Sequence, residues 1–233
     1  MKKAAIIQRR FRLFMLKSKT SSRLNDLRDD RLNEWRAMQN EFKAQWSEIK
    51  ESRRIEIHIN SFSISEMQRM TIEKYKQKEN AQIARLFGVK DPNVNIIYIC
   101  PFPLTSEIYN YYLKILELVE IEHPEKRFHV IVPENYTRFS SHLSLTQALL
   151  YSPLALKQVR DIIRGKQSYI VPGRPSDYDM QLSMTLRVPL MSGEPALTKV
   201  FSTKSGAKRI FQLADVPVPL GAYDIYSYDS FCA

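Results

Sequence analysis

The sequence is poor in several residues that common functional sites require. It has six glycines, and none stands at the spacing of a Walker or dinucleotide-binding loop, so no phosphate loop is predicted. Its two cysteines, Cys100 and Cys232, lie far apart without other ligand types beside them, which argues against a disulfide framework and a zinc site and favours a reducing, cytoplasmic compartment. No apolar run approaches about 18 residues, so no membrane span is predicted.

Histidine is also scarce. The four histidines fall in different predicted elements without mutual ligand spacing: His58, His123, His129 and His142. A metal site needs several ligands at close spacing, so we predict none. Without a phosphate loop or a ligand cluster, the sequence indicates no cofactor.

Positive charge is concentrated at the N-terminus. The formal net charge is +10 over 233 residues. Residues 1–20 carry seven Lys or Arg and no acid, which leaves only +3 for everything after them. A nucleic-acid groove depends on many clustered phosphate contacts, so the nearly balanced body predicts no nucleic-acid partner.

Residues 4–17 follow the pattern of an IQ motif, which asks for an aliphatic residue, Gln, three free positions, Arg, Gly, three free positions and a basic residue. Ile7 and Gln8 are followed at this spacing by Arg12 and Lys17, and only Leu13 departs, because it replaces the glycine. IQ motifs bind calmodulin or related light chains. The resemblance therefore implies that Gln8 hydrogen-bonds backbone in one light-chain lobe and that Arg12 meets its carboxylates.

Helical geometry supports this interpretation. Ile7, Phe11 and Phe14 stand at i, i+4 and i+7 and form one apolar stripe, which Arg9 and Arg10 flank. An apolar face with basic flanks suits insertion into the groove of an acidic partner. The bulk of Leu leaves open binding through one lobe or in a shifted pose.

Three other interpretations apply to the same basic helix. It could lie on an anionic membrane or on nucleic acid. An Arg-rich, acid-free N-terminus also resembles a mitochondrial transit peptide. We prefer light-chain binding to all three because the motif positions are nearly all met, and we expect neither a membrane nor a nucleic-acid partner.

The next segment is highly charged and predicts a long helix from Ser22 to about Arg54. It lacks Gly and Pro and places apolar residues at three- and four-residue steps: Leu24, Leu27, Trp35, Met38, Phe42, Trp46 and Ile49. This narrow seam needs a partner surface, which could be another helix of the chain, a light chain or a filament wall.

Residues 54–60 alternate isoleucine with polar residues, as in a half-buried strand. Ser63 and Glu66 predict a capping box for a second helix that ends at Phe87 before Gly88. We place a boundary at 90–92, because the elongated, charged arm there gives way to a more evenly apolar body.

The body alternates strands and helices. Apolar runs predict strands at 95–100, 128–132 and 169–171, and helical patterns fall at 106–119 and at 143–164, with a break near Pro153. Strands separated by helices imply parallel βαβ units. We therefore predict the α/β class, as a Rossmann-like unit of three or four strands.

The remaining residues predict shorter elements. These are a helix at 177–187, a loop at 192–195, a helix at 203–214 capped by Thr203, and a short strand at 222–226.

Residues 203–219 carry a second resemblance. A lysine, a helix and then Val216-Pro217-Val218-Pro219 resemble the opening of an ATP-grasp fold, in which this element follows a Rossmann-like pre-ATP-grasp domain. Asp215 stands where Gly is usual. This resemblance covers roughly residues 94–229. Together with the IQ helix and the charged arm, it is similar to a family of IQ motif proteins of cilia and sperm flagella.

These patterns divide the chain into four predicted regions: an IQ motif helix at 1–20, a charged helical arm with one short strand at 21–91, a Rossmann-like pre-ATP-grasp domain at 92–175, and the start of an incomplete ATP-grasp-like region at 176–233. The ATP-binding lysines and magnesium-binding acids of ATP-grasp enzymes would lie after Ala233. We therefore assign no catalytic residue.

A candidate ligand loop follows the third predicted strand of the body, at the edge where α/β folds bind ligands. Arg174 there could grip an anion, Asp177 follows it, and Lys204 could approach a nucleotide. A polar turn, a helix cap and a solvated lysine explain the same residues without a ligand.

The sequence thus predicts a non-enzymatic adaptor in which the IQ helix recruits a calmodulin-like light chain and the remainder anchors it to an axoneme. One alternative is the N-terminal part of an ATP-grasp carboxylate-amine ligase. Another is a microtubule-wall protein whose basic helix touches acidic tubulin tails.

Overall fold

The computed structural model describes residues 2–138, 143–225 and 227–232. Side chains are not described at 2–14, 16, 18, 22 and 230. The chain divides into two compact units, Met1–Lys50 and Glu51–Ala233, and each is considered by itself.

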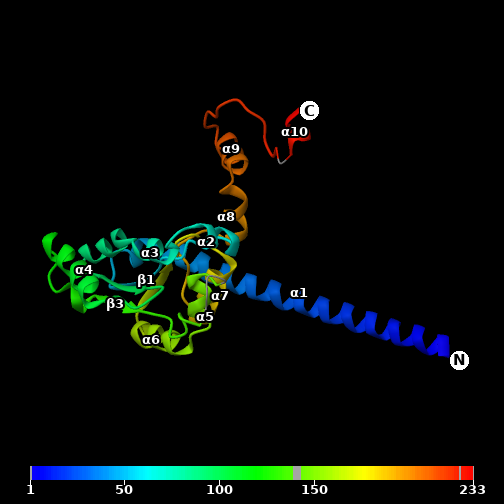
Figure 1. Cartoon of the computed structure of the whole chain (residues 1–233), viewed down its shortest axis with the longest axis horizontal. Helices are drawn as coiled ribbons and strands as arrows, with labels where there is room; N and C mark the ends of the chain where they lie inside the picture. The colour runs from blue at the N-terminus through cyan, green and yellow to red at the C-terminus, as the bar shows by residue number, and fades with distance from the viewer. Residues whose placement is uncertain (1, 139–142, 226, 233) are drawn as a thin grey trace. The chain divides into compact units, whose positions relative to one another are not determined.

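The first unit is the single helix α1, Lys2–Ile49 (Figure 1). Its 48 residues contain neither Gly nor Pro. Because no residue in it breaks the backbone hydrogen bonds, the two helices predicted at 4–17 and 22–54 form one continuous helix, about 70 Å long. It ends at Ile49, five residues before the predicted end.

The second unit alternates strands with helices, and its elements have these bounds: β1 Arg54–Ile59, α2 Glu66–Thr71, α3 Tyr75–Asn80, the 3₁₀ helix η1 Ile83–Lys90, β2 Val94–Ile99, α4 Ser106–Leu118, the 3₁₀ helix η2 Pro124–Lys126, β3 Phe128–Ile131, α5 Leu145–Leu150, α6 Pro153–Ile163, β4 Gln167–Val171, α7 Asp177–Leu186, α8 Pro195–Phe201, α9 Lys204–Leu213 and α10 Tyr228–Cys232.

The strands form a four-stranded parallel sheet in the order β3-β2-β1-β4. Ile57 of β1 lies opposite Ile97 of β2 on one side and Ile170 of β4 on the other. The α/β class and the Rossmann-like arrangement are therefore confirmed. In this order, the chain leaves β1 toward β2 on one side of β1 and later returns to β4 on the other side.

Helices cover both faces of the sheet. The connections from β1 to β2 and from β2 to β3 move in one direction, whereas the connection from β3 to β4 moves back, and right-handed crossovers place the two sets on opposite faces. Figure 1 shows α3 and α4 on one side of the strands and α5 and α6 on the other. Burial on both faces explains why β2 is apolar at nearly every position.

One core cluster lies between η1, β2, β3 and α4. Leu86, Tyr98 and Leu116 are fully buried in it, and the Tyr98 and Phe128 rings meet edge to face at 5.9 Å. Cys100 is also buried here, and its Sγ donates to Asn80 Oδ1 at 3.3 Å. Burial raises the pKa of Cys100 to about 12. Cys232, in contrast, is exposed.

The structure corrects three predicted elements. The arm's predicted strand is β1, which pairs on both sides and is central to the sheet. The predicted helix at 63–87 is divided into α2, α3 and η1, because Lys74 adopts a left-handed backbone (φ 54°) and Ser65 with Gln68, rather than Ser63 with Glu66, forms the capping box. Residues 222–225 of the last predicted strand form no strand, and residue 226 lies outside the described residues.

Candidate functional site

The helix α1 carries the predicted light-chain motif. Its backbone is helical from residue 2, so positions 7, 11 and 14 fall on one face. Lys17 is exposed, whereas the side chains of the other motif residues lie outside the described residues: Ile7, Gln8, Phe11, Arg12 and Phe14. The predicted helix is confirmed, and light-chain binding stays a prediction.

The predicted apolar seam continues along the described part of α1. Leu24 is 60% exposed and Leu27 is 52% exposed. Farther along, the rings of Phe42 and Trp46 meet edge to face at 5.5 Å, as neighbours one turn apart do. The seam therefore offers apolar contact area about two to three turns after the motif.

A second candidate site lies at the carboxyl edge of the sheet, between β1 and β4. The crossovers diverge from this point, and open α/β sheets bind ligands in the crevice that such a divergence leaves. The two strand exits touch, since the Arg174 backbone N–H donates to Ser61 O at 3.2 Å. A Cβ on Gly173 would stand only 2.0 Å from Ser61 O, so this close approach requires glycine.

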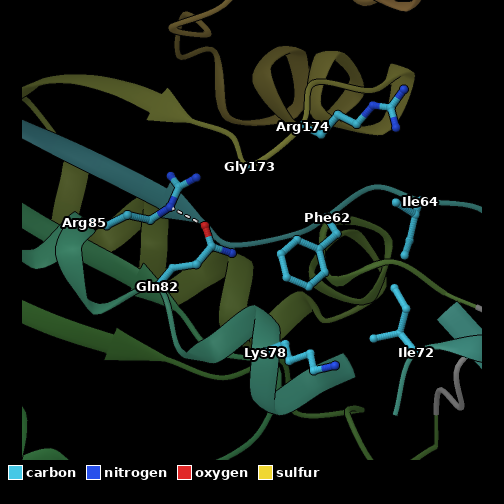
Figure 2. A pocket seen from close by; sticks show the side chains of 8 residues that line it. All are labelled: Phe62, Ile64, Ile72, Lys78, Gln82, Arg85, Gly173 and Arg174. Carbon is cyan, nitrogen blue, oxygen red and sulfur yellow. Dashed lines mark hydrogen bonds between the residues drawn. The ribbon is translucent and has the colours of Figure 1, made fainter. Parts of the chain in front are cut away.

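An open pocket of about 590 Å³ occupies this position. Its volume lies within the usual range of small-molecule sites. Figure 2 shows its lining residues, with Phe62 between the Arg174 loop and Lys78. They come from the loop after β1, from Ile72, α3 and η1, and from the loop after β4: Phe62, Ile64, Ile72, Lys78, Gln82, Arg85, Gly173 and Arg174.

Arg85 and Gln82 are held by hydrogen bonds at one side of the pocket. Arg85 Nε donates to Gln82 Oε1 at 2.8 Å, and its two terminal nitrogens donate to the carbonyls of Val171 (3.4 Å) and Pro172 (3.2 Å). Gln82 Nε2 in turn donates to Asn60 O at 2.8 Å. The guanidinium therefore links the exits of both strands.

The lining is cationic. Among the described residues, Lys78, Arg85 and Arg174 line the pocket and no Asp or Glu does so. Within the described residues, none of the three cations has a carboxylate within ion-pair distance. Partial burial of the Arg85 guanidinium lowers its pKa.

One carboxyl group lies behind the pocket wall. Glu79 is only 1% exposed, and its Oε1 accepts the Phe62 backbone N–H at 2.9 Å. Burial raises its pKa to about 7, against the opposing effects of that hydrogen bond and of the Arg69 and Lys76 charges. This carboxyl therefore supports the β1 exit and is partly neutral near pH 7.

The structure separates the residues of the predicted ligand loop. Arg174 lines the pocket, whereas Asp177 is exposed at the start of α7 and Lys204 is exposed at the start of α9, and neither lines it. Of the three, only Arg174 therefore belongs to this pocket, and ligand binding by the loop stays a prediction. Sequence reasoning missed three lining residues: Lys78, Gln82 and Arg85. Only the folding of α3 and η1 onto the strand exits brings them to the pocket. The one local signal was the pair of cations at positions 78 and 85.

Asp179 is a helix cap. It is 1% exposed and accepts hydrogen bonds from the Ser176 backbone N–H and hydroxyl and from the Thr146 hydroxyl, at 2.8, 2.6 and 2.8 Å. Burial raises its pKa, although these bonds oppose the shift. Because several donors already bind it, the carboxylate stabilises α7 and leaves little capacity for a ligand.

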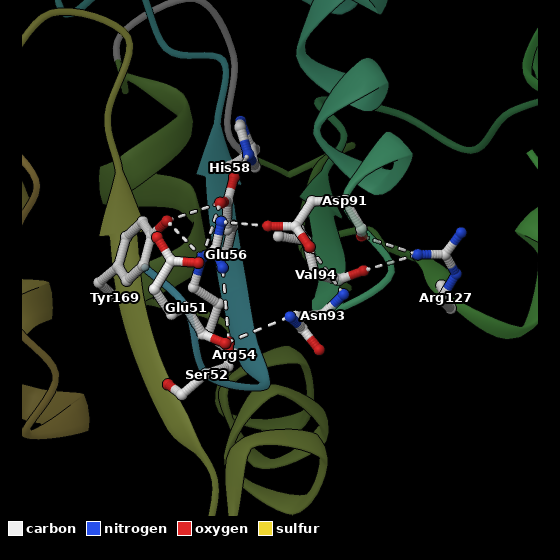
Figure 3. A network of polar contacts seen from close by, with 10 residues as sticks. All are labelled: Glu51, Ser52, Arg54, Glu56, His58, Asp91, Asn93, Val94, Arg127 and Tyr169. Carbon is white, nitrogen blue, oxygen red and sulfur yellow. Dashed lines mark hydrogen bonds and ion pairs between the residues drawn. The ribbon is translucent and has the colours of Figure 1, made fainter. Parts of the chain in front are cut away.

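The amino edge of the sheet holds a polar network instead of a pocket (Figure 3). Arg54 donates to Asp91 Oδ2 at 2.9 Å and to the Tyr169 hydroxyl at 3.3 Å. The Tyr169 hydroxyl donates to Glu56 Oε1 at 2.6 Å, and His58 Nε2 lies 3.0 Å from Glu56 Oε2. Cross-strand register explains this gathering, since Glu56 lies opposite Tyr169.

The network neutralises its charges internally. Burial opposes ionisation of Glu56, but hydrogen bonds from His58 and Tyr169 and the Arg54 charge hold its pKa below the usual value. Arg127 extends the network by donating to Asp91 O at 2.9 Å. These ion pairs and hydrogen bonds tie the strand starts together.

The segment from α8 to α10 includes a side-chain cap at the start of α9. Thr203 Oγ1 accepts the Gly206 N–H at 3.0 Å, which confirms the predicted cap of α9. The chain then folds back on this helix, because Lys208 donates to Pro219 O at 3.0 Å and Arg209 pairs with Asp224. Both cations also lie near the Tyr223 ring.

Two classes of feature are absent from the part of the chain that the structure describes. It contains no group of three or more His, Cys, Asp or Glu side chains placed to hold a metal ion. No described helix combines the length and apolarity that crossing a bilayer requires.

Comparison with known proteins gives one relative for most of the chain. IQ motif-containing protein H of Danio rerio is 35% identical over 195 residues, which cover 79% of this chain. The chain resembles IQ motif-containing protein H. It spans 18% of the length of that relative. No solved structure matches the chain.

A family model described as IQCH-like, ATP-grasp matches residues 195–233. The match begins at the first residue of α8 and includes α9 with its Thr203 cap. The ATP-grasp resemblance of the 203–219 segment and the likeness to IQ motif-containing protein H are thereby confirmed.

Proposed function

We propose that this chain is a non-catalytic adaptor that recruits calmodulin or a calmodulin-like light chain through α1. One observation carries the proposal: the IQ pattern of residues 4–17 lies on a backbone that is helical from residue 2. The similarity to a protein named for its IQ motif supports it.

The physical basis is helix-in-groove binding. The face formed by positions 7, 11 and 14 supplies apolar anchors, and the basic positions around it attract an acidic partner. Gln8 and Arg12 add hydrogen bonds and ion pairs that fix the register. With Leu13 in the glycine position, the light chain would bind either through one lobe or in a shifted pose.

Mixing the purified chain with calmodulin, with and without calcium, tests the proposal by gel filtration and calorimetry. We expect a complex in at least one condition. The double substitution of Ile7→Ala with Gln8→Ala is expected to weaken it about tenfold or more, since it removes an anchor and a register contact. Arg31→Ala, an exposed residue of the same helix outside the motif, serves as the control and is expected to bind normally.

Two results contradict the light-chain proposal. One is the lack of a complex in both calcium conditions. The other is undiminished binding by the double variant while the wild type and Arg31→Ala also bind.

For the rest of the chain we propose an anchoring role in an axonemal assembly of cilia or flagella. An alternative is a microtubule-wall protein, which sedimentation with microtubules tests: strong weakening of binding by salt would support contact of the basic helix with acidic tubulin tails. Failure of the chain to sediment with microtubules at low salt would contradict direct contact with tubulin.

A second candidate function is the N-terminal part of an ATP-grasp carboxylate-amine ligase. The match of residues 195–233 to the ATP-grasp family model favours it. Equilibrium dialysis measures whether this chain binds magnesium-ATP. Saturable nucleotide binding would support the ligase, whereas the adaptor proposal expects none.

A further inference from the structure

We propose that the pocket between the exits of β1 and β4 binds a small organic anion with an apolar body, such as a carboxylate or a phosphate monoester. All of its lining residues belong to the second unit, and the proposal goes beyond the adaptor function. The proposal rests on the pocket's position, charge and lining.

The first argument is electrostatic. Three cationic side chains and no Asp or Glu are among the described residues that line the pocket, so an entering anion meets a positive potential that the partly neutral Glu79 behind the wall offsets only in part. Arg85 is the best placed of the three. Its partly buried guanidinium has five N–H donors, three of which are used by Gln82, Val171 and Pro172, so donors remain for a ligand.

The second argument is preorganisation. The hydrogen bonds that hold Arg85 and Gln82 also tie η1 to both strand exits. The contact of Gly173 with Ser61 fixes the opposite wall. An anion entering here would therefore meet groups that are already placed, which lowers the entropic cost of binding.

The third argument defines the ligand's body. Phe62, Ile64 and Ile72 are all partly exposed and line the pocket beside the cations (Figure 2). An apolar group of the ligand would cover these side chains while the anionic group approaches Arg85 and Lys78. Such a mixed lining suits an amphipathic ligand better than a bare inorganic ion.

The loop after β1 argues against a dinucleotide. Residues 60–65 contain no glycine, and α2 begins only at Glu66 and has six residues. No glycine-rich turn therefore presents backbone N–H groups to a pyrophosphate. A compact, single anionic group fits the side-chain cations.

Nuclear magnetic resonance titration of the ¹⁵N-labelled chain tests the proposal with three probes: 4-phenylbutyrate, phenyl phosphate and the neutral 4-phenylbutan-1-ol. We expect saturable shifts of the Phe62, Gln82 and Gly173 amides with at least one anion and much weaker binding of the alcohol. Comparison of the two anions decides between carboxylate and phosphate. Inorganic phosphate alone is expected to bind more weakly than phenyl phosphate.

Substitutions then connect binding to the named cations. Lys78→Gln and Arg174→Gln are each expected to weaken anion binding about threefold, because both side chains are exposed, and Arg85→Lys to weaken it about tenfold. Lys90→Gln, an exposed cation outside the lining, controls for net charge and is expected to bind normally. Circular dichroism checks that each variant is folded.

Three outcomes would overturn the anion site. The first is no saturable shift with either anion up to about 10 mM. The second is equal binding of the alcohol and the anions. The third is unchanged anion binding by both Lys78→Gln and Arg174→Gln. These two variants leave the hydrogen bonds of Arg85 intact, so the test holds even if Arg85→Lys does not fold.

Discussion

The amino and carboxyl edges of the sheet differ in whether their charged side chains are paired with one another. At the amino edge, Arg54 pairs with Asp91, and Glu56 is bound by Tyr169 and His58. At the carboxyl edge, the described residues that line the pocket include three cations and no Asp or Glu. A set of mutually satisfied charges holds a structure together, whereas a set of uncompensated charges around a cavity is available to a ligand.

The two edges also differ in the pKa of a buried carboxyl group. At the amino edge, donors and a cation lower the pKa of Glu56 despite its burial. Beside the carboxyl edge, burial raises the pKa of Glu79 to about 7. Environment rather than residue type therefore decides whether each carboxyl group is ionised at neutral pH. The two groups are expected to change the stability of the fold with pH in opposite directions.

Glu79→Gln is expected to have the largest effect, which depends on pH. Because the folded pKa lies above the unfolded value, the native state keeps a proton that the unfolded state releases, and stability falls as pH rises from about 4.5 to about 7. The wild type should lose on the order of 3 kcal/mol relative to the variant over this interval. Urea unfolding at about pH 5 and about pH 8 measures it.

The control for this prediction is Glu73→Gln, a carboxylate with 85% side-chain exposure. It is expected to leave the pH profile unchanged. A wild type and Glu79→Gln variant with parallel profiles would show that the Glu79 carboxyl is ionised normally in the fold. Glu56→Gln should have the opposite sign, since its stabilising charge is present at neutral pH and is lost in acid.

Gly173→Ala ranks second. The added methyl group would overlap Ser61 O, so the two strand exits must separate, at a cost of about 2–3 kcal/mol. Thermal unfolding measures the loss. Gly193→Ala is the matched control, because its nearest neighbour would stand at 3.6 Å in ordinary contact. Equal melting temperatures for the two variants would contradict the close approach of the exits.

Tyr169→Phe should have the smallest effect of the three. It removes the 2.6 Å hydrogen bond to Glu56 and the acceptor for Arg54, which should destabilise the fold by about 1–2 kcal/mol. Denaturant unfolding near neutral pH measures this change, with Tyr111→Phe, 62% exposed, as the control. A loss confined to Tyr169→Phe would confirm that the amino-edge network stabilises the sheet.

Local patterns were sufficient for much of this fold. The apolar runs that became β2, β3 and β4 and the helical patterns of α4, α7 and α9 were all predicted near their observed bounds. These elements depend on short-range signals, namely burial on both strand faces and caps such as Thr203. Alternation likewise predicted β1 as a strand.

The place of β1 could not be predicted from the same signals. Its pairing with β4 joins residues more than 100 positions apart, and a charged stretch before it suggested an arm. The pocket was missed for the same reason, since its lining comes from separate segments that only tertiary packing brings together. Helix α8 was missed although Pro195 at its first position is a known start signal.

The two thiols differ in solvent accessibility, so one of them can be labelled selectively. Cys100 has a pKa near 12 and is shielded by packing, so maleimide chemistry at neutral pH would pass it over. Cys232 is open to solvent. A single fluorophore would therefore attach close to the last residue without mutagenesis, and its tumbling would report assembly onto large complexes.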